Sequence, residues 1–196
     1  MTKKKKIVLG ILVVVFTPII LLMIWHSLRH YHLPPFVGRV IDSDTKEPVE
    51  GAAALAVYYK TTWGIAGSNT VPFDARESLT DAKGEFKIPM KSGWFGEISG
   101  KAEADLTIFK PGYGVYPNHK RSAAVGGNKS WPPPKKHVVY EIPKLNTLEE
   151  RKKNLSFRQF GELPLEKRKD FATLIDHERN SLGFEPLTIP RKKQGK

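Results

Sequence analysis

The chain lacks cysteine altogether, and this absence excludes several kinds of chemistry. Without Cys among its 196 residues, it has no disulfide, thiolate zinc site, cysteine nucleophile or lipid-modified cysteine. Acidic residues are also missing from the first 41 positions. A metal site built on the neighbouring His26, His30 and His32 would therefore lack a carboxylate ligand. We therefore interpret these histidines as structural, amphipathic residues rather than metal ligands.

Familiar catalytic motifs are absent as well. The sequence contains no His-Glu-x-x-His, no Gly-x-Ser-x-Gly, no Walker loop and no Gly-x-Gly-x-x-Gly. Metallopeptidase, hydrolase and nucleotide-binding functions therefore have no motif to support them. We predict no catalytic residue, no cofactor and no metal. An enzyme with carboxylates carried on loops stays open as an alternative, because such pairs leave no signature in sequence spacing.

Charge is plentiful but unevenly placed. The formal net charge is +12, yet residues 36–144 are nearly balanced, with 15 basic and 12 acidic residues. The excess collects at the two ends of the chain. A nucleic-acid-binding domain instead concentrates its basic residues on one face. We therefore predict no nucleic-acid partner, and a basic cytosolic protein is only a background alternative.

The longest uncharged run lies near the N-terminus, at residues 7–28. A helix of this length, at about 1.5 Å per residue, spans the roughly 30 Å hydrocarbon layer of a bilayer. Four lysines within residues 1–6 precede the run and only Arg29 closely follows it. The positive-inside rule therefore predicts a cytoplasmic N-terminus and a periplasmic or extracellular remainder. No small-residue cleavage site follows, which favours a single-pass anchor in the cell (inner) membrane over a cleaved signal peptide.

After a short proline-containing linker at residues 29–35, the pattern changes to short strands. Alternating or uncharged runs predict strands at 36–42, 52–59, 104–109 and 137–142. Ser78–Thr80 and Glu85–Ile88 flank a turn ending in Gly84, which predicts a short hairpin. Five or more such strands indicate a sandwich over residues 36–144.

Two stretches within this domain are predicted to be irregular. One is a loop around Trp63 and Gly67. The other runs from Tyr113 to Lys136 and contains a polyproline segment, which we interpret as a rigid linker.

Residues 145–196 carry helical signals and end in a basic tail. Asn146 followed by Glu149 predicts the start of one helix. A second is predicted from Pro164 to Leu182, stopping at Gly183. The apolar residues of this second helix fall on one face, as docking on a sheet requires. We predict a short helical C-terminal arm.

Several blocks of the predicted sandwich resemble one family. They are Gly38-x-Val40-x-Asp42-x-x-Thr45-x-x-Pro48-Val49-x-Gly51-Ala52, Thr80-Asp81-x-x-Gly84-x-Phe86-x-Ile88 and Lys110-Pro111-Gly112-Tyr113. This set resembles the carboxypeptidase regulatory-like domain, a transthyretin-like Greek-key β-sandwich, over residues 36–113, with 138–142 as a closing strand. The resemblance implies a domain that folds, presents or binds rather than catalyses. Insertions after Lys60 and Lys91 and the helical arm depart from it.

Aromatic residues in or beside the loops are the candidate contact residues. They are Trp63, Trp94, Tyr113, Tyr116 and Trp131, and such rings stack on sugars or anchor protein partners when they are exposed. The competing interpretation is that they cover a small core. We predict a non-catalytic, membrane-anchored cell-envelope module that contacts the lipid bilayer through residues 7–28 and an envelope protein or glycan elsewhere. A carbohydrate- or peptidoglycan-binding module is the first alternative.

Overall fold

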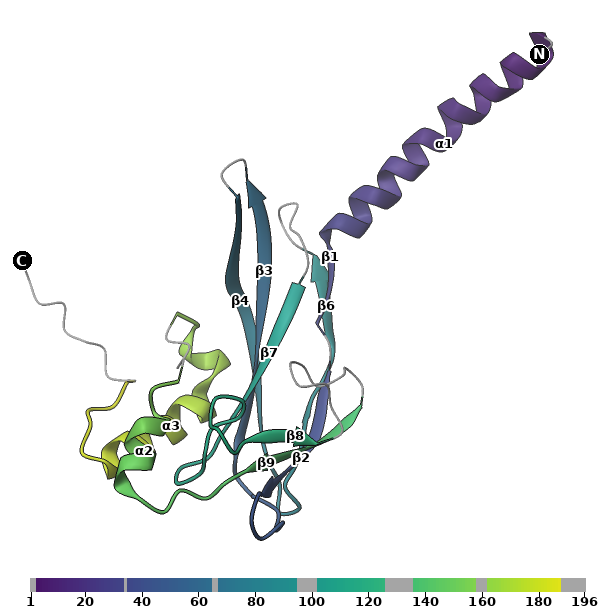
Figure 1. Ribbon diagram of the computed structural model, residues 1–196. Coiled ribbons are helices and arrows are strands. Elements are labelled where there is room, and N and C mark those ends of the chain that lie inside the picture. Colours follow the sequence, from purple (N-terminus) through teal and green to yellow (C-terminus); the bar gives the residue numbers. More distant parts are fainter. Residues whose placement is uncertain are drawn as a thin grey trace, which may run out of the picture.

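The computed structural model describes residues 3–33, 35–64, 67–94, 102–125, 136–157 and 162–187 (Figure 1). In the N-terminal helix, the side chains it describes are those of Lys5 and residues 12–25. Within these ranges the chain is mainly β, as the sequence predicts, and its strands form three sheets.

Helix α1 (Lys3–Arg29) projects away from the sheets (Figure 1). Its large apolar side chains from Leu12 to Trp25 are all exposed. Residues 7–28, predicted to span a membrane, are thus helical. Among the residues that the structure describes, however, no helix combines the length and the apolar character needed to cross a membrane.

The segment after α1 is a strand rather than only a linker. Strand β1 (His30–Leu33) pairs antiparallel with β6 (Lys91–Trp94). The predicted linker at 29–35 therefore contains a paired strand, and the reason is burial: the side chain of Leu33 is completely enclosed in the core. Pro34 lies outside the described residues.

Two larger sheets make up the body of the domain. The four-stranded sheet has the order β5-β2-β9-β8 and the three-stranded sheet has the order β4-β3-β7. Their strands are β2 (Phe36–Asp42), β3 (Ala53–Gly64), β4 (Gly67–Leu79), β5 (Glu85–Ile88), β7 (Ala102–Phe109), β8 (Ala123–Val125) and β9 (His137–Ile142). The pairing of β2 with β9 is parallel and the other pairings are antiparallel. The predicted strands at 36–42 and 137–142 match β2 and β9 residue for residue.

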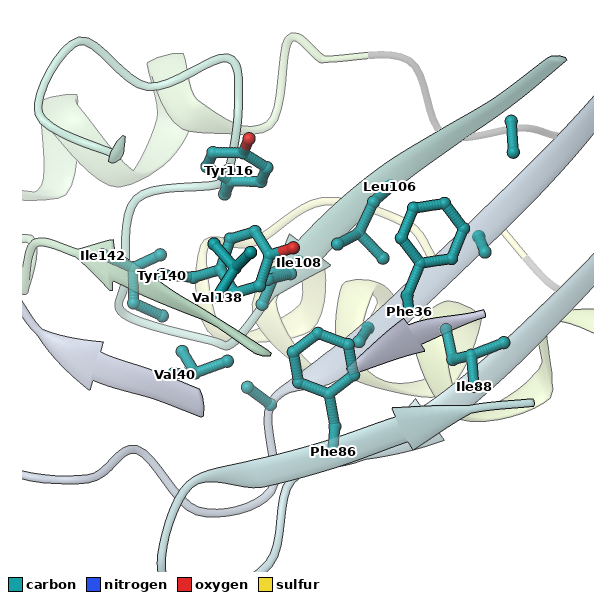
Figure 2. Close-up of a cluster of buried hydrophobic side chains, with 14 of the residues drawn as sticks. Phe36, Val40, Phe86, Ile88, Leu106, Ile108, Tyr116, Val138, Tyr140 and Ile142 are labelled. Carbon is teal, nitrogen blue, oxygen red and sulfur yellow. The ribbon is translucent and has the colours of Figure 1, made fainter. Parts of the chain in front are cut away.

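The two sheets enclose the first hydrophobic core (Figure 2). Alternate residues of each strand point into it, as the two-residue period of a strand requires. The four-stranded sheet contributes Phe36, Val40, Phe86, Ile88, Val138, Tyr140 and Ile142, and the three-stranded sheet contributes Ala54, Ala56, Tyr58, Leu106 and Ile108. The ring of Tyr140 contacts that of Tyr116 edge to face, with their centroids 5.0 Å apart. This core holds the two sheets together.

The inner part of β3, residues 53–59, is buried on both faces. Ala54, Ala56 and Tyr58 face the first core, whereas Leu55 and Val57 belong to a second core on the other side of the same sheet. Residues 52–59 are all buried. A strand covered on both faces reads as a continuous apolar run rather than an alternating one, which explains the absence of charge from this stretch.

The C-terminal arm supplies the cover for that second core. It consists of α2 (Leu148–Asn154), the 3-10 turn η1 (Leu165–Lys167) and α3 (Lys169–Ser181). Phe171 and Ile175 of α3 are fully buried against the three-stranded sheet. The ring of Phe171 contacts those of Phe109 and Phe157, each at 6.1 Å between centroids. The one-sided apolar pattern of the predicted second helix is therefore a docking face.

Charged groups hold the arm in place at three points. The Glu77 carboxylate on β4 accepts hydrogen bonds from the backbone N–H groups of Asp170 and Phe171, both at 2.9 Å, and so caps the N-terminus of α3. Asp74, also on β4, pairs with Lys167 of η1 at 2.6 Å and with Lys91 at 2.8 Å.

The third charged contact joins the two helices of the arm to each other. Arg151 of α2 donates two hydrogen bonds to the buried Glu178 of α3, at 2.8 and 2.6 Å. Two parallel hydrogen bonds between a guanidinium and a carboxylate fix the relative orientation of the two side chains as well as pairing their charges. Helices α2 and α3 therefore dock on the sheet as a pair.

The turn at Gly84 connects the two sheets and does not close a hairpin. Gly84 adopts φ +75° and its N–H donates to the carbonyl of Asp81 at 2.8 Å, as a tight turn requires. The strands on either side, however, belong to different sheets. The hairpin prediction is wrong because the Gly84 carbonyl accepts from the N–H of Val40, which draws β5 onto β2.

The residues around Trp63 and Gly67 form a long antiparallel ribbon where the sequence predicts a loop. Strands β3 and β4 stay paired out to Gly64 and Gly67, with a register shift between Tyr58 and Tyr59. Outer positions of the ribbon are rich in threonine, and the hydroxyls of Thr61 and Thr70 hydrogen-bond across it at 3.0 Å. β-Branched side chains favour such exposed strands.

Helix boundaries in the arm also differ from the prediction. Thr147, one residue after Asn146, is the N-cap of α2. Its hydroxyl accepts from the N–H of Glu150, whose carboxylate accepts from the Thr147 N–H. The second predicted helix is divided, since Pro164 is the N-cap of η1 and α3 starts only at Lys169. Strand β8 falls inside the predicted loop from Tyr113 to Lys136, whose polyproline segment lies outside the described residues.

We expect Phe171→Ala to lower the free energy of unfolding by about 3–5 kcal/mol, because the ring is fully buried between arm and sheet. Phe184→Ala in the same arm is the control. Its ring is 41% exposed and lies beside the cations of Lys152 and Arg179, so it should cost under about 1 kcal/mol. Denaturant titration of the full-length protein in detergent measures both. Equal losses would contradict a docked arm.

We expect Glu77→Ala to destabilise the protein by about 0.5–2 kcal/mol, since two backbone donors of α3 lose their acceptor. Glu77→Gln should cost less, because its amide oxygen still accepts from one of them. Thermal unfolding followed by far-UV circular dichroism measures the change, with the exposed Glu50→Ala as the control. A loss for Glu77→Ala no larger than that of the control would disprove the capping role.

Candidate binding pocket between the sheets and the arm

The five predicted contact aromatics do not gather at one place. Tyr116 lies in the first core and Tyr113 is half-buried against it. Trp94, on β6, is 55% exposed. Trp63 belongs to β3, but the structure describes only its backbone, and Trp131 lies outside the described residues. Among these five residues, the described side chains include one exposed tryptophan, and one ring does not by itself make the coplanar platform that sugar stacking needs.

Metal ligands do not cluster either. Within the described ranges, no group of three or more His, Asp or Glu side chains is placed to hold a metal ion. The side chains of His26 and His30 are not among those described, and His32 is exposed on β1.

A pocket of about 710 Å³ lies where the arm meets the loop between β7 and β8. This volume is typical of small-molecule sites. Its lining comes from two segments: Val115, Asn118, His119, Lys120 and Arg121 from the loop, and Glu150, Lys153, Asn154, Ser156 and Phe157 from α2 and the residues just after it. Sequence reasoning did not find this pocket, because its two halves are about 30 residues apart and come together only through docking of the arm.

Asn154 fixes the two halves of the pocket to each other. Its side-chain oxygen accepts from the N–H of Val115 at 2.9 Å and its amide nitrogen donates to the carbonyl of Tyr113 at 3.0 Å. The side chain is buried. Asn154 thus binds the backbone of residues 113–115 through both an acceptor and a donor, which holds this segment against α2. The pocket therefore has a rigid base.

The loop itself is held by its own hydrogen bonds. The N–H of His119 donates to Val115, the N–H of Ser122 donates to His119, and the hydroxyl of Ser122 donates to Gly114. Gly114 allows the ring of His119 to approach closely, because a Cβ atom at this position would meet the ring at 2.6 Å. The loop is therefore preformed.

His119 presents a neutral ring to the pocket at physiological pH. Burial lowers the pKa of His119, and the positive charges of Arg121 and Lys120 lower it further. The negative charge of Glu150 acts in the opposite direction and raises it. Its Nδ1 accepts from the N–H of Arg121 at 3.2 Å, which places the proton of the neutral ring on Nε2. The ring therefore offers a hydrogen-bond donor.

The charges around the pocket are predominantly positive. Three cations, Lys120, Arg121 and Lys153, line it together with one carboxylate, that of Glu150. Glu150 is occupied by the capping box, whose hydrogen bonds lower the pKa of its carboxyl group. Arg121 forms an ion pair with Asp44. Such a pocket is equipped to bind an anion.

Comparison with known proteins finds no family model, no curated protein and no solved structure that matches this chain.

We expect His119 to titrate below its usual pKa in an NMR pH titration. Arg121→Gln should move this pKa up, because it removes a neighbouring positive charge, whereas Glu150→Gln should move it down. Since the unfolded chain binds a proton at His119 more readily than the folded one, this group makes folding less favourable as the pH falls below about 6.5. Titration at or above the usual value, or shifts of the same sign in both variants, would contradict this geometry.

Proposed function

We propose that this protein is a single-pass, membrane-anchored cell-envelope module with a structural or binding role and no catalytic activity. The observation that carries the proposal is α1, which projects away from the domain (Figure 1) and whose large apolar side chains from Leu12 to Trp25 are exposed. Globular proteins rarely leave so large an apolar surface uncovered.

The uncharged run at residues 7–28 supports the same role for α1. At about 1.5 Å per residue, this stretch is long enough for the hydrocarbon layer. The lysines before it favour a cytoplasmic N-terminus. In this proposal the β domain faces the periplasm or the extracellular side of the inner membrane, and the bilayer is one partner.

The β domain belongs, in this proposal, to the carboxypeptidase regulatory-like group of Greek-key sandwiches. The places of the motif residues support this. Thr80 is buried, and its hydroxyl donates to the Val49 carbonyl and accepts from the Ala52 N–H, at 2.7 and 2.8 Å. Asp42 accepts from the N–H groups of the turn that follows β2. These residues serve the fold, as in a module that presents a surface.

A non-catalytic role is supported by how the acidic groups near the pocket are engaged. Glu150 is bound in the capping box of α2. Asp44, beside the loop, is paired with Arg121. A general acid or base needs a carboxyl group that is free to exchange its proton with a substrate, and both of these have structural partners.

Membrane extraction tests the proposal. We expect the full-length protein to remain in the membrane pellet after alkaline carbonate treatment, and the double variant Val14→Arg with Leu21→Arg to be released. Each arginine near the centre of a spanning helix costs about 2.5–3.5 kcal/mol.

The matched control is Leu79→Arg with Met90→Arg, since both side chains are exposed on the domain. This control should stay in the pellet. Release of the wild-type protein, or retention of the α1 double variant, would overturn the anchor.

A further inference from the structure

Two lysines of the pocket differ from its other charged residues in how they are paired. Arg121 is paired with Asp44, and Glu150 with Thr147. Within the described part of the chain, neither Lys120 nor Lys153 forms an ion pair, although both line the pocket. The two lysines come from different segments, one from the loop and one from α2.

The lining as a whole is complementary to an anion. It holds three cations and one carboxylate, and because Arg121 is paired with Asp44, the charge offered to a ligand is that of the two lysines against Glu150. Neutral donors surround them in the side chains of Asn118 and Ser156 and in the ring of His119. A phosphate monoester carries about −1.5 to −2 charges at pH 7 and three acceptor oxygens, and lysine serves as a point charge for such groups.

The pocket has more room than a bare ion needs. Its volume is about 710 Å³, and the largely buried side chains of Val115 and Phe157 lie at its floor. An inorganic anion would leave most of this space unused. A small organic body attached to the phosphate would fill it and reach the exposed edge of Phe157, as ligands in concave sites do.

We propose that this pocket binds a small organic phosphate monoester, with Lys120 and Lys153 contacting the phosphate and Phe157 contacting the organic body. The rigid base supplied by Asn154 and the hydrogen-bonded loop limit the ordering cost on binding to side chains, chiefly the exposed Lys120 and Lys153.

The position of the pocket favours a soluble phosphate ester over a lipid headgroup. Helix α2, which forms one wall, lies on the side of the domain away from α1 (Figure 1). If α1 is embedded in a bilayer, the pocket is held away from the headgroups of that bilayer. Phosphate binding by itself does not depend on the anchor.

Calorimetric titration of the full-length protein in detergent tests the site, with glycerol 3-phosphate as the probe and succinate as the dicarboxylate comparison. We expect saturable binding of glycerol 3-phosphate, at least tenfold weaker binding of succinate, and at least tenfold weaker glycerol 3-phosphate binding in Lys120→Gln with Lys153→Gln. The control, Lys83→Gln with Lys87→Gln, removes the same charge from exposed positions at the β5 edge of the domain. Its affinity should equal that of the wild type.

Four results would overturn the proposal. No saturable binding disproves the site, and an equal loss in the control means that only net charge matters. Equal affinity for succinate would mean that the pocket does not select phosphate esters over dicarboxylates. Pull-down by phosphatidic acid vesicles that depends on Lys120 and Lys153 makes the ligand a lipid headgroup. The Lys120→Gln with Lys153→Gln variant and the Lys83→Gln with Lys87→Gln control should both give the wild-type circular dichroism spectrum. Lys120→Arg with Lys153→Arg keeps the charge at both positions and should therefore keep glycerol 3-phosphate binding.

Discussion

The burial of β3 on both faces is the constraint on which the rest of the domain depends. One face of the strand closes the core between the two sheets and the other receives the C-terminal arm. Over residues 53–59 neither face carries charge, so exposing either would place a wide apolar surface in water. The arm is therefore a structural layer of the domain. Its polar attachments at Glu77 and Asp74 fix where it docks on β4.

The pocket is a consequence of that docking. It requires α2 to lie beside the loop after β7, and this placement follows from Asn154 and from the paired docking of α2 with α3 through Arg151 and Glu178. Helices α1 and α2 lie on different sides of the domain (Figure 1). If α1 is the anchor that we propose, the cationic pocket beside α2 is held at a distance from the membrane. Fold and pocket thus share one cause, the docking of the arm on β3.

Local patterns in the sequence predict most of the strands but not their partners. The alternation in 36–42 and 137–142 matches β2 and β9, and Gly84 lies in the predicted turn. That β4 and β5 belong to different sheets depends on contacts with β2, which no local pattern records. The pocket is nonlocal in the same way, since its cations are ordinary surface lysines until the arm docks. The basic run from His119 to Arg121 was the available signal.

Native-state hydrogen exchange on the full-length protein in detergent tests the two-sided burial most directly. If the arm is an integral layer, the amides of α3 and the central amides of β3 exchange through one shared opening, with the same free energy and the same dependence on denaturant. Exchange of α3 through a separate, lower-energy opening that leaves β3 fully protected would contradict this, because the second face of β3 would then be stable without its cover.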